Sequence, residues 1–118
     1  MANIDTLYKN QFGQMGSVFT SVDGAITPPS NRVFVAITFL ANTTLDSSGG
    51  LVSDTSNDGV EFPSTQAAAH DAGAATAVSG TGGDQIDVND SFPAGVTIFG
   101  RWTSINVGTG MIMAYIGT

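Results

Sequence analysis

The sequence predicts an all-β fold, an antiparallel β-sandwich or jelly-roll-like barrel with a long exposed loop. Charged residues that favour helices are scarce, since Lys9 and Glu61 are the only lysine and glutamate, whereas Gly, Ser, Thr, Asn and Val are plentiful. Short apolar runs are separated by turn signals about every ten residues, which is typical of sandwiches and barrels.

The length of 118 residues fits a single domain. Residues 1–16 are polar with isolated anchors at Leu7, Tyr8 and Phe12, so we interpret them as an extended N-terminal arm. Residues 17–118 are then the single β domain. We expect no targeting segment, because no basic stretch precedes an apolar one near Met1. The longest apolar-rich run, 33–40, is shorter than the roughly 20 residues of a membrane helix.

Two hairpins are predicted in the first half of the chain. Residues 17–22 form a strand closed by Asp23-Gly24, with a short return at 25–27. Leu51 to Ser53 and Val60 to Phe62 flank an Asn-Asp-Gly turn and predict the second hairpin. Between the hairpins, 32–40 is a central strand whose alternating faces carry Val33, Val35, Ile37 and Phe39 on one side and Phe34, Ala36 and Leu40 on the other.

The last third predicts a strand over 96–106 and an antiparallel return over 111–116, with Gly108 and Gly110 in the turn. Gly100 leaves room on its face for a large ring from a neighbouring strand. The predicted core residues are Val35, Ile37, Phe39, Ile98 and Trp102. Residues 64–83, rich in Ala and Gly, are the long exposed loop, with at most one helical turn.

The predicted strands at 33–40 and 111–116 are apolar on both faces, although a sandwich of this size has only one inner layer. Their outer faces therefore predict a subunit interface, formed by Phe34, Leu40, Phe99, Arg101, Met111 and Met113. Arg101 has two interpretations: an interface anchor, or an outward arginine that either lies across a neighbouring aromatic ring or pairs with an acid. For Arg32 the second interpretation is favoured.

The charge balance excludes several partners. Three basic residues against ten acidic ones give a net charge of −7, so nothing neutralises the phosphates of a nucleic acid. The same charge argues against anionic membranes. Cysteine is absent, which excludes disulfides, thiol nucleophiles and thiolate metal sites.

No catalytic residue, metal site or cofactor is predicted. His70 is the only histidine, and its adjacency to Asp71 is not a catalytic arrangement, because neighbours on a chain seldom face each other. The segment 54–59 partly matches a calcium loop, but Thr65 occupies the position that needs a bidentate Glu, so an ordinary turn is the better interpretation. Solvated charges at a sheet edge are expected at Asp84, Asp87 and Asp90.

One part of the sequence resembles a known group. Residues 92–104, FPAGVTIFGRWTS, followed by 113–117, MAYIG, are similar to the ending of small tailed-bacteriophage proteins. In those proteins a strand with the pattern FPxGxTIYGRWT is followed by a hairpin and a final AYFG. The match covers about a quarter of the chain, with Phe99 in place of Tyr and Ile116 in place of Phe. It marks a strand hairpin and not an active site.

The resemblance implies a non-enzymatic virion structural protein, made in the host cytoplasm and located on the capsid surface. A capsid decoration or cement protein would bind the major capsid protein and itself, as a homotrimer, since decoration proteins often occupy capsid three-fold sites. The arm residues Leu7, Tyr8 and Phe12 would then anchor on the shell. The alternative is a tail-tip or fibre domain that binds host surface glycans, although the repeats and heptads typical of fibres are missing from the sequence.

Overall fold

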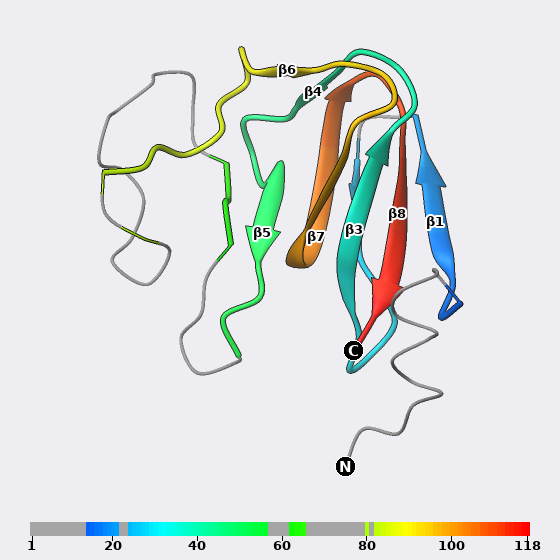
Figure 1. Ribbon diagram of the computed structural model, residues 1–118. Helices are drawn as coiled ribbons and strands as arrows, with labels where there is room; N and C mark the ends of the chain where they lie inside the picture. Colours follow the sequence, from blue (N-terminus) through cyan, green and yellow to red (C-terminus); the bar gives the residue numbers. More distant parts are fainter. Residues whose placement is uncertain (1–13, 22–23, 57–61, 66–79, 81) are drawn as a thin grey trace.

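The computed structural model describes residues 14–21, 24–56, 62–65, 80 and 82–118. This part of the chain is all-β and contains no helix, which confirms the predicted fold class. The described residues form eight strands, which are β1 (Ser17–Thr20), β2 (Ala25–Ile26), β3 (Val33–Phe39), β4 (Thr43–Leu45), β5 (Leu51–Ser53), β6 (Ser91–Phe92), β7 (Thr97–Thr109) and β8 (Ile112–Gly117). Figure 1 shows their arrangement.

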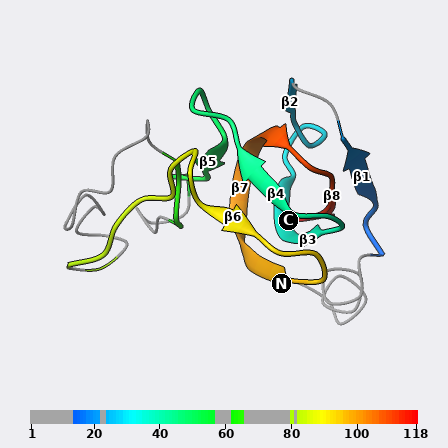
Figure 2. The ribbon, with the colours of Figure 1, turned by 90° about the horizontal axis from the view of Figure 1, so that it is seen from above.

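The strands form one open, antiparallel sheet in the order β1-β8-β3-β7-β4-β6, and β2 and β5 also pair with β7. β7 organises the sheet because it is long enough to pair with four strands. Its first half lies beside β3, and residues beyond Trp102 pair with β2, β5 and β4. Figure 2 shows β7 curving around β3 and β8, so the open sheet encloses a core in the manner of a sandwich.

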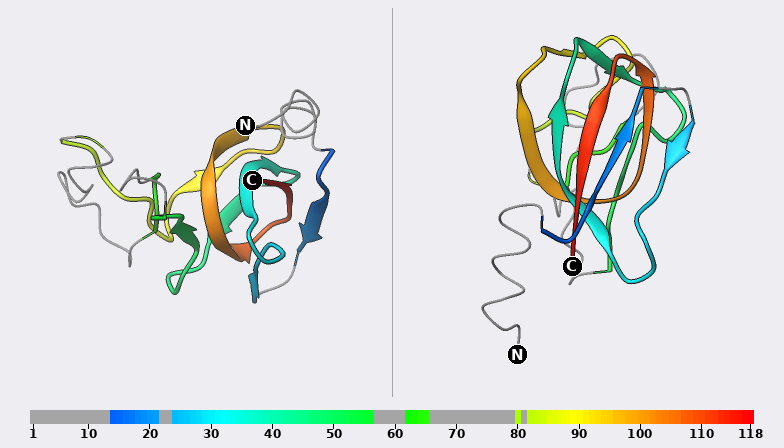
Figure 3. Two further views of the ribbon diagram at one scale, coloured as in Figure 1. Left: turned by 90° about the horizontal axis from the view of Figure 1, so that it is seen from below. Right: turned by 90° about the vertical axis from the view of Figure 1, so that its right-hand side faces the viewer.

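The strands on either side of the predicted Asp23-Gly24 turn do not pair with each other, and neither do the strands on either side of Gly110. β1 and β2 exist close to the predicted positions, but β1 pairs with β8 and β2 pairs with β7. β7 and β8 run antiparallel across a turn at Gly110, yet β3 lies between them. The long curve of β7 carries its second half away from β8 and leaves that position to β3. The right-hand view of Figure 3 shows β8 beside β1.

The hairpin predicted around 57–59 falls largely outside the described residues. Phe62 is described and is not part of a strand. Its backbone N donates to the Ser53 Oγ at 2.8 Å, so a side chain rather than a ladder fixes this point. The turn after β6 spans 93–96, with Val96 N donating to Pro93 O and Gly95 at a φ of 90°.

A β-bulge in β3 corrects the predicted faces of that strand. The registers with β7 and β8 both shift between Phe34 and Ala36, and such a shift exchanges the inward and outward positions on either side of it. Phe34 is therefore fully buried, as are Ile37 and Phe39. The expectation that Phe34 lies on the outer face is wrong, and so is the placement of Val35 in the core, since Val35 is only half-buried.

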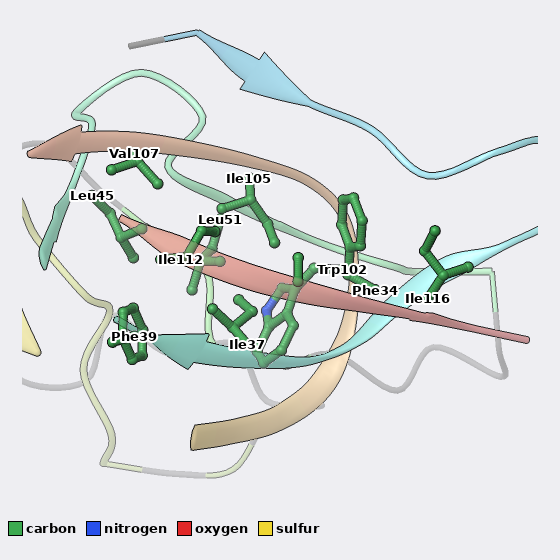
Figure 4. Close-up of a cluster of buried hydrophobic side chains, with 11 residues drawn as sticks. Phe34, Ile37, Phe39, Leu45, Leu51, Trp102, Ile105, Val107, Ile112 and Ile116 are labelled. Atoms are coloured by element: carbon green, nitrogen blue, oxygen red, sulfur yellow. The ribbon is translucent and has the colours of Figure 1, made fainter. Parts of the chain in front are cut away.

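The core lies between the curved strands and is shown in Figure 4. Trp102, Ile37 and Phe39 belong to it as predicted, and Ile98 packs against it while remaining partly buried. The alternation of inward and outward residues along β7 also changes after Trp102. The register with β5 shifts at this point, so Ile105 points inward. The remaining buried members come from five strands: Phe34, Leu45, Leu51, Ile105, Val107, Ile112, Ala114 and Ile116.

Gly100 leaves space for a ring, as predicted, but the ring comes from its own strand. A Cβ on Gly100 would lie 2.7 Å from two atoms of the Trp102 ring and 3.2 Å from Phe62. Trp102 stacks edge-on with Phe62 at a centroid distance of 6.5 Å, and its Nε1 donates to Pro63 O at 2.9 Å. The folded-back indole thus holds residues 62–63 against β7.

Most of the predicted arm and loop lies outside the described residues, including Leu7, Tyr8 and Phe12. The described end of the arm is attached to the sheet, because Gly16 O accepts from Ile116 N at 2.9 Å and Met15 Sδ accepts from Arg32. At the start of the loop, Thr65 bonds to Leu51 and bridges to Ile86.

Candidate functional site

The candidate site is the side of the sheet formed by β1, β8, β3 and β7 that faces away from the core, here called the outer face. Directly opposed residues of neighbouring antiparallel strands share a face. The registers therefore place Phe19, Met113, Thr38 and Thr97 in one row across the four strands. A second row consists of Ser17, Tyr115, Ala36 and Phe99.

The outer face continues beyond the strand ends through Leu40 and Met111. Leu40 N donates to Met111 O at 2.9 Å, which extends the β3–β8 ladder by one residue pair. Leu40 lies two positions after Thr38, and Met111 lies two positions before Met113, so both lie on the same face as these outward residues. The outer face is consequently defined here as Phe19, Thr38, Leu40, Thr97, Phe99, Met111, Met113 and Tyr115.

Large apolar side chains on this face are open to solvent. Phe99 is 77% exposed and Phe19 is 54% exposed, while Leu40 and Met111 are 43% and 36% exposed. Met113 and Tyr115 are half-buried between them. No member of the defined face carries a charge, although the chain as a whole has a net charge of −7.

Four of the six residues predicted for the interface meet on this face: Leu40, Phe99, Met111 and Met113. Phe34 does not, because the bulge in β3 turns it into the core. Sequence reasoning missed Phe19 and Tyr115. Alternation along each strand separates inward from outward residues, but only the β1–β8–β3–β7 ladder reveals that these two join Phe99 and Met113.

Arg101 lies at the border of the outer face and is paired with an acid, the second of its two predicted interpretations. Its Nε lies 3.2 Å from Asp54 Oδ2, and its Nη1 donates to Thr118 O at 2.8 Å. The Arg101 side chain is 27% exposed, whereas that of Asp54 is 6% exposed. The ion pair therefore ties β7 to the residue after β5 and to the residue after β8.

Asp54 is held by its own turn as well as by Arg101. Its Oδ1 accepts from the Oγ and the backbone N of Ser56, at 2.7 and 3.1 Å. The hydrogen bonds from Ser56, more than the Arg101 charge, lower the pKa of the Asp54 carboxyl below its usual range, and burial opposes them. This geometry is that of a side-chain turn with a salt bridge, in keeping with the interpretation of 54–59 as an ordinary turn. Asp58 and Gly59 lie outside the described residues.

The prediction of solvated edge charges is wrong for Asp87. Asp84 is exposed and Asp90 is half-buried, but Asp87 is 1% exposed. Its Oδ1 accepts from Asn89 N at 2.7 Å, and its backbone N donates to Asp90 Oδ2 at 2.9 Å. Asp87 and Asp90 thus organise one turn, which leads into β6, whereas Asp84 accepts from the backbone N of Gln85 at 2.7 Å.

The described residues contain no group of three or more His, Asp or Glu side chains placed to hold a metal ion. His70 lies outside them. Within the same part of the chain, no helix has the length and apolar character needed to cross a membrane. The candidate site that the geometry of the described residues offers is a surface, the outer face, whose exposed side chains suit apolar contact.

Comparison with known proteins leaves the chain without an established relative: no protein-family model, no curated protein and no solved structure matches it.

Proposed function

We propose that the protein is a non-enzymatic structural component of a phage virion, a capsid decoration or cement protein that binds and stabilises the head shell. Its partners in this proposal are the major capsid protein and further copies of itself, with the homotrimer as the expected assembly. The C-terminal resemblance to small tailed-phage proteins supplies the phage context.

The observation that carries the proposal is the uncharged, apolar outer face on a strongly acidic chain. Phe99 and Phe19 expose large aromatic side chains on the same face as Met111 and Leu40. Contiguous exposed apolar residues mark interaction sites, because their burial against a partner removes apolar area from water. Aromatic and Met side chains are also enriched in the cores of protein interfaces.

Two surfaces have separate roles in this proposal. The outer face, with Leu40, Phe99, Met111 and Met113, contacts neighbouring copies. The arm residues Leu7, Tyr8 and Phe12 anchor on the shell. Arg101 contributes indirectly, because its bond to Asp54 holds the border of the outer face in place.

Immunogold labelling of purified particles of the encoding phage tests this function. An antibody raised against the folded protein is expected to label the head, with many gold particles per virion. Label confined to the tail tip or fibres would overturn the decoration role and support the glycan-binding alternative. Particles that carry no label, in a preparation where the protein is detected only in infected cells, would exclude a virion role altogether.

A further inference from the structure

β1 forms the edge of the sheet beside β8, as Figure 1 shows. Gly16 O accepts from Ile116 N, so in the alternating pattern of an antiparallel strand the peptide groups of Gly16, Val18 and Thr20 point towards β8. The N–H and C=O groups of Ser17, Phe19 and Ser21 point the opposite way. Within the described part of the chain, no strand pairs with that side of β1.

Other described edges carry protection that β1 lacks. The stretch of β7 at 97–100, which pairs only with β3, is followed directly by the charged Arg101. β6 has two residues and is followed by Pro93, and β2 is followed closely by Pro28. The outer side of β5 is occupied by Thr65, which bonds to both the N and the O of Leu51. β1, Ser-Val-Phe-Thr, contains no proline and no charge, and its register with β8 has no bulge. Exposed edges without such features are templates for pairing with another chain.

We propose that β1 pairs antiparallel with β1 of a second copy about a two-fold axis that passes beside Phe19. Opposed residues must share a face, so the pairing joins residues of the same inward or outward type. Phe19 then lies opposite its counterpart, and Ser17 lies opposite Ser21. In this register the outward peptide groups of Ser17, Phe19 and Ser21 bond to each other across the axis, and the edge is self-complementary.

Charge favours a second copy at this edge. Two chains of net charge −7 repel each other, so they can approach closely only where charges are missing. β1 and the adjacent outward residues of β8, Met113 and Tyr115, are uncharged. Pairing would also bring the two Phe19 rings, each 54% exposed in the single chain, into contact on one side of a continuous sheet.

The edge pairing goes beyond the proposed function and does not depend on it. It joins the outer faces of two copies into one apolar surface that spans both sheets. A two-fold contact at β1 is a different interface from a three-fold contact through the outer face, and both can operate in one assembly.

Disulfide trapping tests the pairing directly, because the natural chain contains no cysteine. Opposed residues of a hydrogen-bonded antiparallel pair have Cα atoms about 5.5 Å apart, within the range that a disulfide spans. The F19C variant is expected to form a covalent dimer under mild oxidation. T97C is the matched control, since Thr97 occupies the same row of the outer face on β7, three strands from β1. It is expected to remain a single chain on a non-reducing denaturing gel.

Light scattering of the natural chain gives an independent readout. The expected mass is an even multiple of the 12.0 kDa chain, and Phe19→Lys, which places two like charges across the axis, is expected to halve it, while Thr97→Lys leaves it unchanged. Circular dichroism checks that each variant retains its β structure. A monomer or a trimer of the natural chain, or equal cross-linking of F19C and T97C, would overturn the edge pairing. Neither result bears on whether the protein labels the phage head.

Discussion

Arg101 and Asp54 are bonded to each other twice. The Arg101 Nε lies 3.2 Å from Asp54 Oδ2, and the Asp54 backbone N donates to Arg101 O at 2.9 Å. The pair joins the middle of β7 to the end of β5, and Arg101 also bonds to Thr118 O beyond β8. The Arg101 side chain thus holds the border of the outer face in place.

Asp54→Asn is expected to lower the free energy of unfolding at pH 7 by about 1–3 kcal/mol, because a buried charged acceptor is lost. The pKa of Asp54 is lowered in the folded state, chiefly by the Ser56 hydrogen bonds. Its ionisation therefore stabilises the fold above the unfolded pKa, near 3.8, and this contribution is lost as the pH falls through the folded pKa. Urea unfolding at several pH values should show the natural protein converging with D54N in acid.

The matched control for this prediction is Asp46→Asn. Asp46 makes the same kind of turn, with its Oδ1 accepting from Ser48 N at 2.8 Å, but that bond is exposed. We expect a smaller loss than in D54N. Equal losses in the two variants would show that the Asp54–Arg101 bond contributes nothing beyond its turn.

Gly100→Ala is expected to destabilise the protein by roughly 1–3 kcal/mol, because the added Cβ would lie 2.7 Å from the Trp102 ring and force it to move. Gly108→Ala is the control, since its Cβ would meet its nearest neighbours at 3.4 Å, and the loss of unfolded-state entropy favours alanine. Thermal unfolding together with Trp fluorescence checks both effects. A stable G100A variant with unchanged emission would contradict the packing of the indole over Gly100.

Trp102→Ala is expected to cost about 3–5 kcal/mol, because it empties the largest buried side-chain volume in the core. Trp102→Phe retains much of the ring but removes the Nε1 bond to Pro63 O, and should cost about 1–3 kcal/mol. Denaturant unfolding measures both values. A nearly neutral W102A would contradict the burial of Trp102 in the core.

Phe99→Asp is expected to leave the stability of the single chain within about 0.5 kcal/mol, because the side chain is 77% exposed. It should nevertheless abolish association through the outer face, since it places a charge in an apolar contact. Light scattering and sedimentation of mixtures with capsids compare F99D with Thr103→Asp, a substitution on the same strand outside the defined face. Association that survives in F99D would remove the outer face from the proposed function.

Local composition and alternation were sufficient to predict the strand character of this protein. The scarcity of helix-forming charged residues and the two-faced apolar runs at 33–40 and 111–116 identified β3 and β8. The burial of Trp102, Ile37 and Phe39 followed from the same patterns. So did the existence of an apolar outer surface around Phe99 and Met113, because a single sheet layer cannot bury both sides of its strands.

Strand partners and the phase of alternation were decided only by the tertiary structure. The Asp-Gly turn favours pairing of β1 with β2, yet β1 pairs with β8 and β2 pairs with β7, so the two strands lie apart. One extra residue in β3 moves Phe34 from the outer face to the core, and alternation contains no signal for where a bulge falls. Phe19 joins Phe99 on one surface because backbone hydrogen bonding across four strands, which depends on residues far apart in the sequence, sets their common register.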